Sequence, residues 1–205
     1  SFYRSILIPE EDTQFAAVTI FLEDGSAYIA FRGTDNTLTG WKEDFNMSFQ
    51  SSIPAQHLAL EYLQEFAAAH PIPLWMGGHS KGGNLAVYAA AFCKESLQLR
   101  ISKVYSHDGP GFLPHVLQSP GFSRISSRVE KTLPQSSVVG MLLEHQENAK
   151  IIKSRTVSLL QHDPFTLVVD NGAFLPLEQL IMDARHVDRT LSTWLLKKNP
   201  DERER

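Results

Sequence analysis

The sequence predicts an α/β fold, a three-layer sandwich around a mostly parallel central sheet with an antiparallel β-hairpin at its N-terminal end. Two observations support this. Short β-prone apolar runs alternate with segments of helical periodicity along most of the chain, an order typical of parallel strands joined by helices. An Asp-Gly turn signal also separates the first two apolar runs, which is typical of a hairpin.

Turn residues and apolar spacing place the individual elements. The hairpin strands are expected at residues 15–22 and 27–31. Pro54 suits the first turn of a helix, and apolar residues recur at three- and four-residue spacing from Leu58 to Ala67. The same reasoning predicts, in order, a strand at 73–76, a helix at 84–92, strands at 101–105 and 128–133, a short helix at 138–143, a strand at 151–157, and a final helix beginning at Pro176 with an apolar stripe up to Leu195.

Length and composition indicate one domain spanning residues 1–205, with a charged tail at 197–205 that we expect to fray. Hydrophobic residues make up 42% of the 205 positions, enough for one core. The single cysteine, Cys93, cannot form an internal disulfide, and its apolar surroundings predict a small buried side chain.

The charge pattern argues against several classes of partner. A net charge of −4 gives no basic stripe for nucleic acid. No apolar stretch approaches the ~20 residues of a membrane span, and no signal peptide is recognisable. We therefore expect a cytoplasmic protein.

The chain starts at Ser1 instead of Met, and its first residues are typical of the middle of a longer chain. We therefore also expect further residues before Ser1. No ligand spacing typical of a metal site occurs, and no cofactor is expected.

The strongest chemical signal is the G-x-S-x-G sequence Gly78-His79-Ser80-Lys81-Gly82, which lies between a predicted strand and a predicted helix. In a nucleophile elbow this order lifts a serine hydroxyl clear of the sheet, and the small residues at both ends allow close packing of strand and helix. The N–H of Lys81 is then a candidate oxyanion donor. A glycine-rich or phosphate-binding loop is the alternative, although the spacing of Lys81 does not match a Walker loop.

Two blocks together resemble a known family. The sequence Phe31-Arg32-Gly33-Thr34, followed by Trp41 and Asp44, is similar to the F-R-G-[ST]…W…D pattern of class 3 (fungal-type) lipases. GHSKGGNLA resembles their nucleophile block, usually written GHSLGGALA. With HDGPGF and QHDPF downstream, the chain looks still more like a bacterial branch of lipase-like proteins of unassigned function, over residues 15–165.

This resemblance implies an α/β-hydrolase fold and hydrolysis of acyl esters, small or lipid-like, with transient contact at a membrane surface. It implies Thr34 as the second oxyanion donor and a lid at residues 35–40. Several apolar residues expected near the site are candidates for an acyl groove, or else for the core: Met47, Phe49, Phe112, Leu113, Phe165, Phe174 and Leu175.

The general base must follow Ser80, because α/β-hydrolases order their triad as serine, acid, histidine. His162 is the best candidate, since it comes just after the last predicted strand. His145 is the second choice, although it follows a predicted helix instead of a strand. The other histidines after Ser80 are His107, His115 and His186: His107 precedes the natural acid position, and His186 belongs to the predicted final helix.

The acid departs from the class 3 pattern, in which an aspartate follows the next strand. Residues 133–139 match that block and contain no carboxylate. Asp108, after the strand at 101–105, is the preferred acid, with Asp163 and Glu144 as alternatives; Asp before Gly is also a common turn residue. This departure motivates a second hypothesis, a catalytically inactive binding or scaffold module. A thioesterase or acyltransferase would use the same triad.

Overall fold

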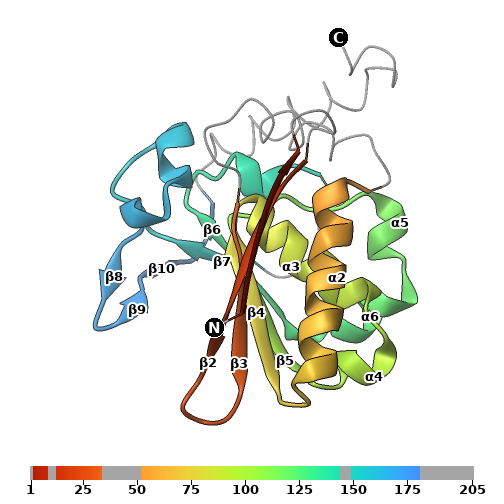
Figure 1. Ribbon diagram of the computed structural model, residues 1–205. Helices are drawn as coiled ribbons and strands as arrows, with labels where there is room; N and C mark the ends of the chain where they lie inside the picture. Colours follow the sequence, from red (N-terminus) through yellow and green to blue (C-terminus); the bar gives the residue numbers. More distant parts are fainter. Residues whose placement is uncertain (1, 9–12, 34–51, 144–148, 181–205) are drawn as a thin grey trace.

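The computed structural model describes residues 2–8, 13–33, 52–143 and 149–180. They form a mixed, mostly parallel sheet of eight strands in the order β1-β2-β3-β4-β5-β6-β7-β10, packed against helices (Figure 1). The strands from β3 to β7 run parallel to one another, whereas β1–β2, β2–β3 and β7–β10 are antiparallel pairs. The predicted α/β class and mostly parallel sheet are thus confirmed.

The elements have the following bounds. The strands are β1 Phe2–Ile8, β2 Thr13–Phe21, β3 Ala27–Phe31, β4 Leu74–His79, β5 Ile101–His107, β6 Val129–Pro134, β7 Ala149–Ile152, β8 Val169–Asp170, β9 Ala173–Phe174 and β10 Pro176–Leu177. The α-helices are α2 Pro54–Ala69, α3 Lys81–Phe92, α4 Glu95–Gln98, α5 Pro114–Leu117 and α6 Pro120–Ile125, and the 3₁₀ turns are η2 Ser126–Arg128, η3 Val139–Met141, η4 Ser158–His162 and η5 Pro164–Thr166.

The strand order determines where the helices lie. The parallel strands are neighbours in the sheet in the same order as in the sequence, so right-handed crossovers bring each connecting helix to the same face. Accordingly α3 packs on β3, β4 and β5, with α2 and α6 beside it (Figure 1). In the described part of the chain, helices cover this one face. The predicted third layer of the sandwich is not seen among the described residues.

The core lies between this face and the helices. Its largest fully buried side chains include Phe15, Ile29, Tyr62, Leu63, Phe66, Leu74, Met76, Leu85 and Phe122. Cys93 is buried as predicted, and burial raises the pKa of its thiol to about 12. None of the described helices is long and apolar enough to cross a membrane.

Three local expectations were wrong or incomplete. β1 was not predicted, because Arg4 and Ser5 interrupt its apolar residues; it is a half-buried edge strand on β2. The strand expected at 151–157 ends at Ile152, where the chain turns into an irregular segment. Pro176 does not begin a helix: it starts β10, which pairs with β7, and residues 178–180 are not helical.

The glycines around Ser80 let α3 begin directly against the sheet. A Cβ on Gly78 would meet main-chain atoms of Phe31 and Gly82, and a Cβ on Gly82 would meet the Phe31 carbonyl oxygen at less than contact distance. Backbone atoms cannot move aside as a flexible side chain can. The predicted requirement for small residues at these two positions therefore has a direct steric cause.

We predict that Gly82→Ala lowers the free energy of unfolding by roughly 1–3 kcal/mol, because the added methyl group overpacks a rigid contact. Urea unfolding followed by circular dichroism measures the change. Ser123→Ala, at an exposed position of α6, is the control and should stay within about 0.5 kcal/mol of the parent. Equal stabilities for the Gly82 variant and the control would contradict this account.

Candidate active site

Ser80 forms the whole junction between a strand and a helix. β4 ends at His79 and α3 begins at Lys81, so one residue makes the turn, with φ 56° and ψ −132°. A positive φ is unfavourable for a residue with a Cβ, and surrounding contacts must hold it. Here the Ser80 N–H donates to the His107 carbonyl at 2.9 Å, and the Ser80 carbonyl accepts from the Gly83 N–H at 2.9 Å.

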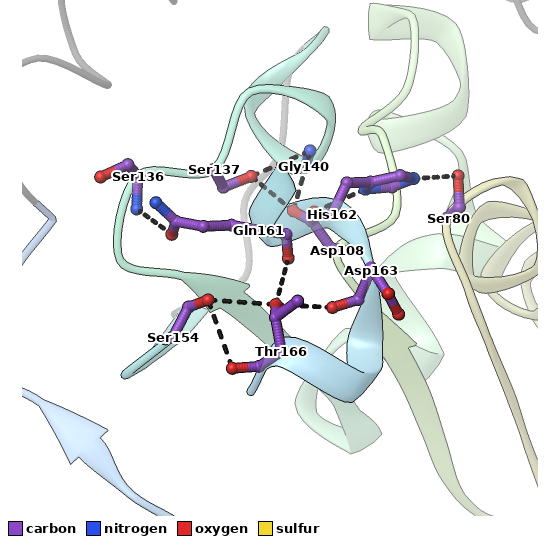
Figure 2. A network of polar contacts seen from close by, with 10 residues as sticks. All are labelled: Ser80, Asp108, Ser136, Ser137, Gly140, Ser154, Gln161, His162, Asp163 and Thr166. Atoms are coloured by element: carbon purple, nitrogen blue, oxygen red, sulfur yellow. Dashed lines mark hydrogen bonds and ion pairs between the residues drawn. The ribbon is translucent and has the colours of Figure 1, made fainter. Parts of the chain in front are cut away.

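Three side chains from distant parts of the sequence form a continuous chain of hydrogen bonds (Figure 2). His162 Nε2 lies 2.9 Å from Ser80 Oγ, and His162 Nδ1 lies 2.7 Å from Asp108 Oδ2. The carboxylate can only accept, so the proton lies on Nδ1 and Nε2 is left to accept from the serine hydroxyl. The structure thus brings together the three residues that the sequence proposed as nucleophile, base and acid.

Strand order explains why Asp108 reaches this place. Ser80 follows β4 and Asp108 follows its parallel neighbour β5, with His79 paired to His107 in the register. The two residues therefore lie side by side at the carboxyl edge of the sheet, where ligands bind in open α/β sheets. Asp108 also has a positive φ of 50°, a conformation that aspartate tolerates better than most residues.

The carboxylate of Asp108 is buried but well supplied with donors. Its side chain is 5% exposed, compared with 29% for His162. Oδ1 accepts from Ser137 Oγ and from the Gly140 N–H at 3.1 Å, leaving Oδ2 to His162 (Figure 2). Hydrogen bonds of this kind stabilise the charged form of a buried carboxylate. No sequence pattern indicates these two donors, because the loop after β6 reaches Asp108 only in the folded chain.

A buried amide on α3 fixes the loop that carries Asp108. Asn84 Nδ2 donates to the carbonyls of Pro110 at 3.3 Å and Gly111 at 2.9 Å, and Asn84 Oδ1 accepts from Gln56 on α2 at 2.9 Å. The GHSKGGNLA block has this asparagine where the family block has alanine. Sequence reasoning missed its role, although a polar residue in an otherwise apolar helix was a usable signal.

His162 is delivered by two consecutive 3₁₀ turns, η4 and η5. The preceding residue, Gln161, is buried, and its Oε1 accepts from the Ser136 N–H at 3.0 Å. Thr166 Oγ1 donates to the Asp163 carbonyl at 2.7 Å and shares a 3.0 Å contact with Ser154 Oγ (Figure 2). These bonds tie the segment to the loop after β6 and to the chain after β7.

Of the two predicted oxyanion donors, the described residues include Lys81 but not Thr34. Lys81 is the first residue of α3, so its N–H lies at the helix N-terminus beside Ser80. Its side chain points away, and the buried ammonium donates to the Gln14 carbonyl at 3.1 Å. Thr34 lies outside the described residues. The residue before it, Gly33, passes so close that a Cβ there would lie 3.3 Å from Ser80 Cβ.

Two further histidines surround the site. The rings of His79 and His162 have centroids 4.6 Å apart. Burial lowers the pKa of His79, and the neighbouring His162 lowers it further; burial also lowers the pKa of His107, which shares a 2.7 Å hydrogen bond with Thr132 Oγ1. The nitrogen and oxygen atoms of His79, Asp108 and His162 are close enough to be considered as ligands of a metal ion. Because His162 and Asp108 already bond each other, the arrangement fits a proton relay better.

The other candidates fall elsewhere. His115 is exposed on α5. The Asp163 carboxylate accepts from the Phe165 N–H at 3.0 Å and caps η5. His145, His186 and Glu144 lie outside the described residues, as do Trp41, Asp44 and the residues 35–40 where a lid was expected.

Comparisons with known proteins give a family match and structural likenesses at low sequence identity. The family model described as Mbeg1-like matches residues 1–205. No curated protein sequence matches the chain. A solved structure of a Rhizomucor miehei lipase propeptide complex, a deletion mutant, is similar with a TM-score of 0.50 at 16% identity; it covers 74% of this chain, which spans 54% of that one. The extracellular lipase LipA of Serratia marcescens gives a TM-score of 0.39 at 17% identity, covering 63% of this chain and 23% of LipA. At such identities the Rhizomucor likeness concerns the fold alone.

We predict that Asn84→Leu lowers the free energy of unfolding by roughly 1–3 kcal/mol, because it leaves buried polar partners on α2 and on the Asp108 loop without a hydrogen bond. Urea unfolding measures it. Gln118→Leu, the same kind of change at an exposed position, should shift stability by less than about 0.5 kcal/mol. If the two variants were equally stable, Asn84 would not hold the loop.

Proposed function

We propose that this chain, which belongs to the Mbeg1-like family, is a serine hydrolase that cleaves carboxylic acyl esters through an acyl-enzyme intermediate. The observation that supports this best is the pair of hydrogen bonds that His162 makes, 2.9 Å to Ser80 Oγ and 2.7 Å to Asp108 Oδ2. A serine hydroxyl is a weak nucleophile until an adjacent base accepts its proton. We assign this base to His162, which Asp108 would orient through the second hydrogen bond.

Each residue has one task in the proposed reaction. Ser80 Oγ attacks the acyl carbonyl while its proton passes to His162 Nε2, giving a tetrahedral oxyanion. The intermediate collapses, and the leaving alcohol takes the proton from His162. Water then attacks the acyl-enzyme by the same route and releases the carboxylic acid. Asp108 holds the ring in the required tautomer and stabilises the imidazolium without being protonated itself.

The oxyanion needs donors beside Ser80. We assign one to the N–H of Lys81 at the start of α3, and the second to Thr34. The course of Gly33 against Ser80 supports this second position. Each such donor contributes about 3 kcal/mol to stabilisation of the transition state.

We further propose that the fold is an α/β-hydrolase related to class 3 lipases. The single-residue elbow after a central parallel strand and the order serine, acid, histidine support it. The acid follows β5, one strand earlier than in the class 3 pattern. The absence of a carboxylate in residues 133–139, which motivated the scaffold hypothesis, is offset by Asp108.

The substrate is proposed to be apolar, such as a lipid-like ester, met at a membrane or lipid surface. Large apolar side chains around η4 and η5 stand in solvent: Val157 is 68% exposed, Leu160 69% and Phe165 90%. Leu160 and Phe165 lie in the segment that carries His162, and Val157 directly precedes it. Of the residues expected to line an acyl groove, Phe165 and Phe174 are exposed, whereas Phe112 is buried in the core. Met47 and Phe49 lie outside the described residues.

We predict that a fluorophosphonate probe labels the wild-type chain and that Ser80→Ala abolishes both labelling and hydrolysis of p-nitrophenyl esters. The thermal midpoint should stay near that of the parent. Mass spectrometry of the labelled peptide gives the site, with Ser123→Ala as the matched variant that still labels. A folded wild-type chain that does not label would favour the scaffold hypothesis. Hydrolysis of a thioester in preference to the oxygen ester would favour a thioesterase.

We predict that Asp108→Asn lowers kcat roughly 10⁴-fold, because an amide no longer fixes the productive tautomer of the base. Asp163→Asn, at the neighbouring carboxylate that caps η5, should keep kcat close to the parent value. Steady-state kinetics on a soluble ester measures both. A large loss in the Asp163 variant with a nearly active Asp108 variant would reassign the acid.

A further inference from the structure

Two buried side-chain nitrogens near His162 lack a hydrogen-bond partner among the described residues: Gln161 Nε2 and His79 Nε2. Gln161 is 1% exposed. Its amide cannot be turned round, because Oε1 accepts from the Ser136 N–H at 3.0 Å. Its Nε2 hydrogens are therefore fixed donors. A buried donor without an acceptor costs about 1–3 kcal/mol, so such groups are rare unless something else binds them.

Both nitrogens belong to residues that line the same small cavity. It has a volume of about 10 Å³ and is lined by His162 and by the polar residues His79, His107, Asp108, Thr132 and Gln161. That volume is close to the least that holds one water molecule, and a buried water needs two to four polar partners. The cavity is too small for an organic ligand.

The two nitrogens are complementary for a water molecule. The Gln161 amide donates. The His79 ring is held in its neutral form by burial, and the main chain of His162 is a hydrogen-bonding partner of the same ring. With its proton on Nδ1, His79 presents Nε2 as an acceptor. A water molecule can accept from the first and donate to the second.

We propose that one internal water molecule binds in this cavity and bridges Gln161 Nε2 to His79 Nε2, and that the two residues thereby position His162. Gln161 directly precedes the base and His79 directly precedes the nucleophile. The bridge joins the two segments whose relative placement sets the 2.9 Å contact between His162 and Ser80. The kinetic part of this inference rests on the proposed hydrolase function, whereas binding of the water does not.

The first test is direct. A high-resolution crystal structure of the full chain should show a water molecule within hydrogen-bond distance of both nitrogens, and the same density should be absent or displaced in Gln161→Met. A wild-type cavity without that density would overturn the proposal, whatever the activity of the protein.

The second test uses two substitutions of His79. A glutamine places an acceptor near the position of Nε2, whereas an asparagine places one near Nδ1. His79→Gln should therefore keep most of the activity, while His79→Asn lowers kcat roughly 10- to 100-fold with little change in KM, as expected for a misplaced base. Equal losses in the two variants would contradict a bridge through Nε2.

A double-mutant cycle is the third test. If water links the two residues, His79→Asn combined with Gln161→Met should cost no more in kcat than the worse single variant, whereas independent effects would multiply. Gln98→Met is the control: this buried amide donates to Ala90 and Ala91, so its loss should lower stability and leave kcat unchanged. Multiplying effects would overturn the bridge. If the wild type neither labels nor turns over, the hydrolase proposal fails, and the crystallographic test still decides the water site.

Discussion

The junction between β4 and α3 has no spare residue, and most of the site follows from this constraint. A strand and a helix joined through Ser80 alone require a positive φ at that residue and contact between main-chain atoms at both ends. Gly78 and Gly82 provide that contact against Phe31. The same turn puts the first N–H groups of α3 beside the serine. One local geometry therefore directs the hydroxyl of Ser80, a residue that is 8% exposed, at His162 and supplies the electrostatic field around it.

The second organising feature is the adjacency of β4 and β5. Because the parallel strands follow one another in sequence order, Ser80 and Asp108 leave neighbouring strands at the same edge of the sheet. The acid therefore needs no long loop to reach the base. Its burial is made tolerable by Ser137 and Gly140, which donate to the oxygen that His162 does not use. An acid placed early in the sequence thus remains compatible with a base that comes late.

The sequence predicted those elements whose structure depends on residues close together in the chain. Pro54 and the periodic apolar residues after it located α2, and the glycines around Ser80 located the elbow. It failed where a residue acts through distant contacts. Asn84 stands out as a polar residue in an apolar helix, but neither its partners nor those of Gln161 can be identified from local pattern, because they lie on other segments and become neighbours only on folding. Pro176 fitted a helix start as well as a strand, and pairing with β7 decided it.

The segments that form the site differ in how tightly they pack against the rest of the protein. The nucleophile and the acid belong to one packed unit, in which Asn84 joins α3 to the loop after β5. The base comes from short 3₁₀ turns whose apolar residues, such as Leu160 and Phe165, stand in solvent. Segments with few buried contacts open at lower free energy than the core. On warming, the segment η4–η5 should therefore detach first. His162 would then lose its alignment with Ser80 and Asp108 while the circular dichroism signal of the sheet and helices is still that of the native protein.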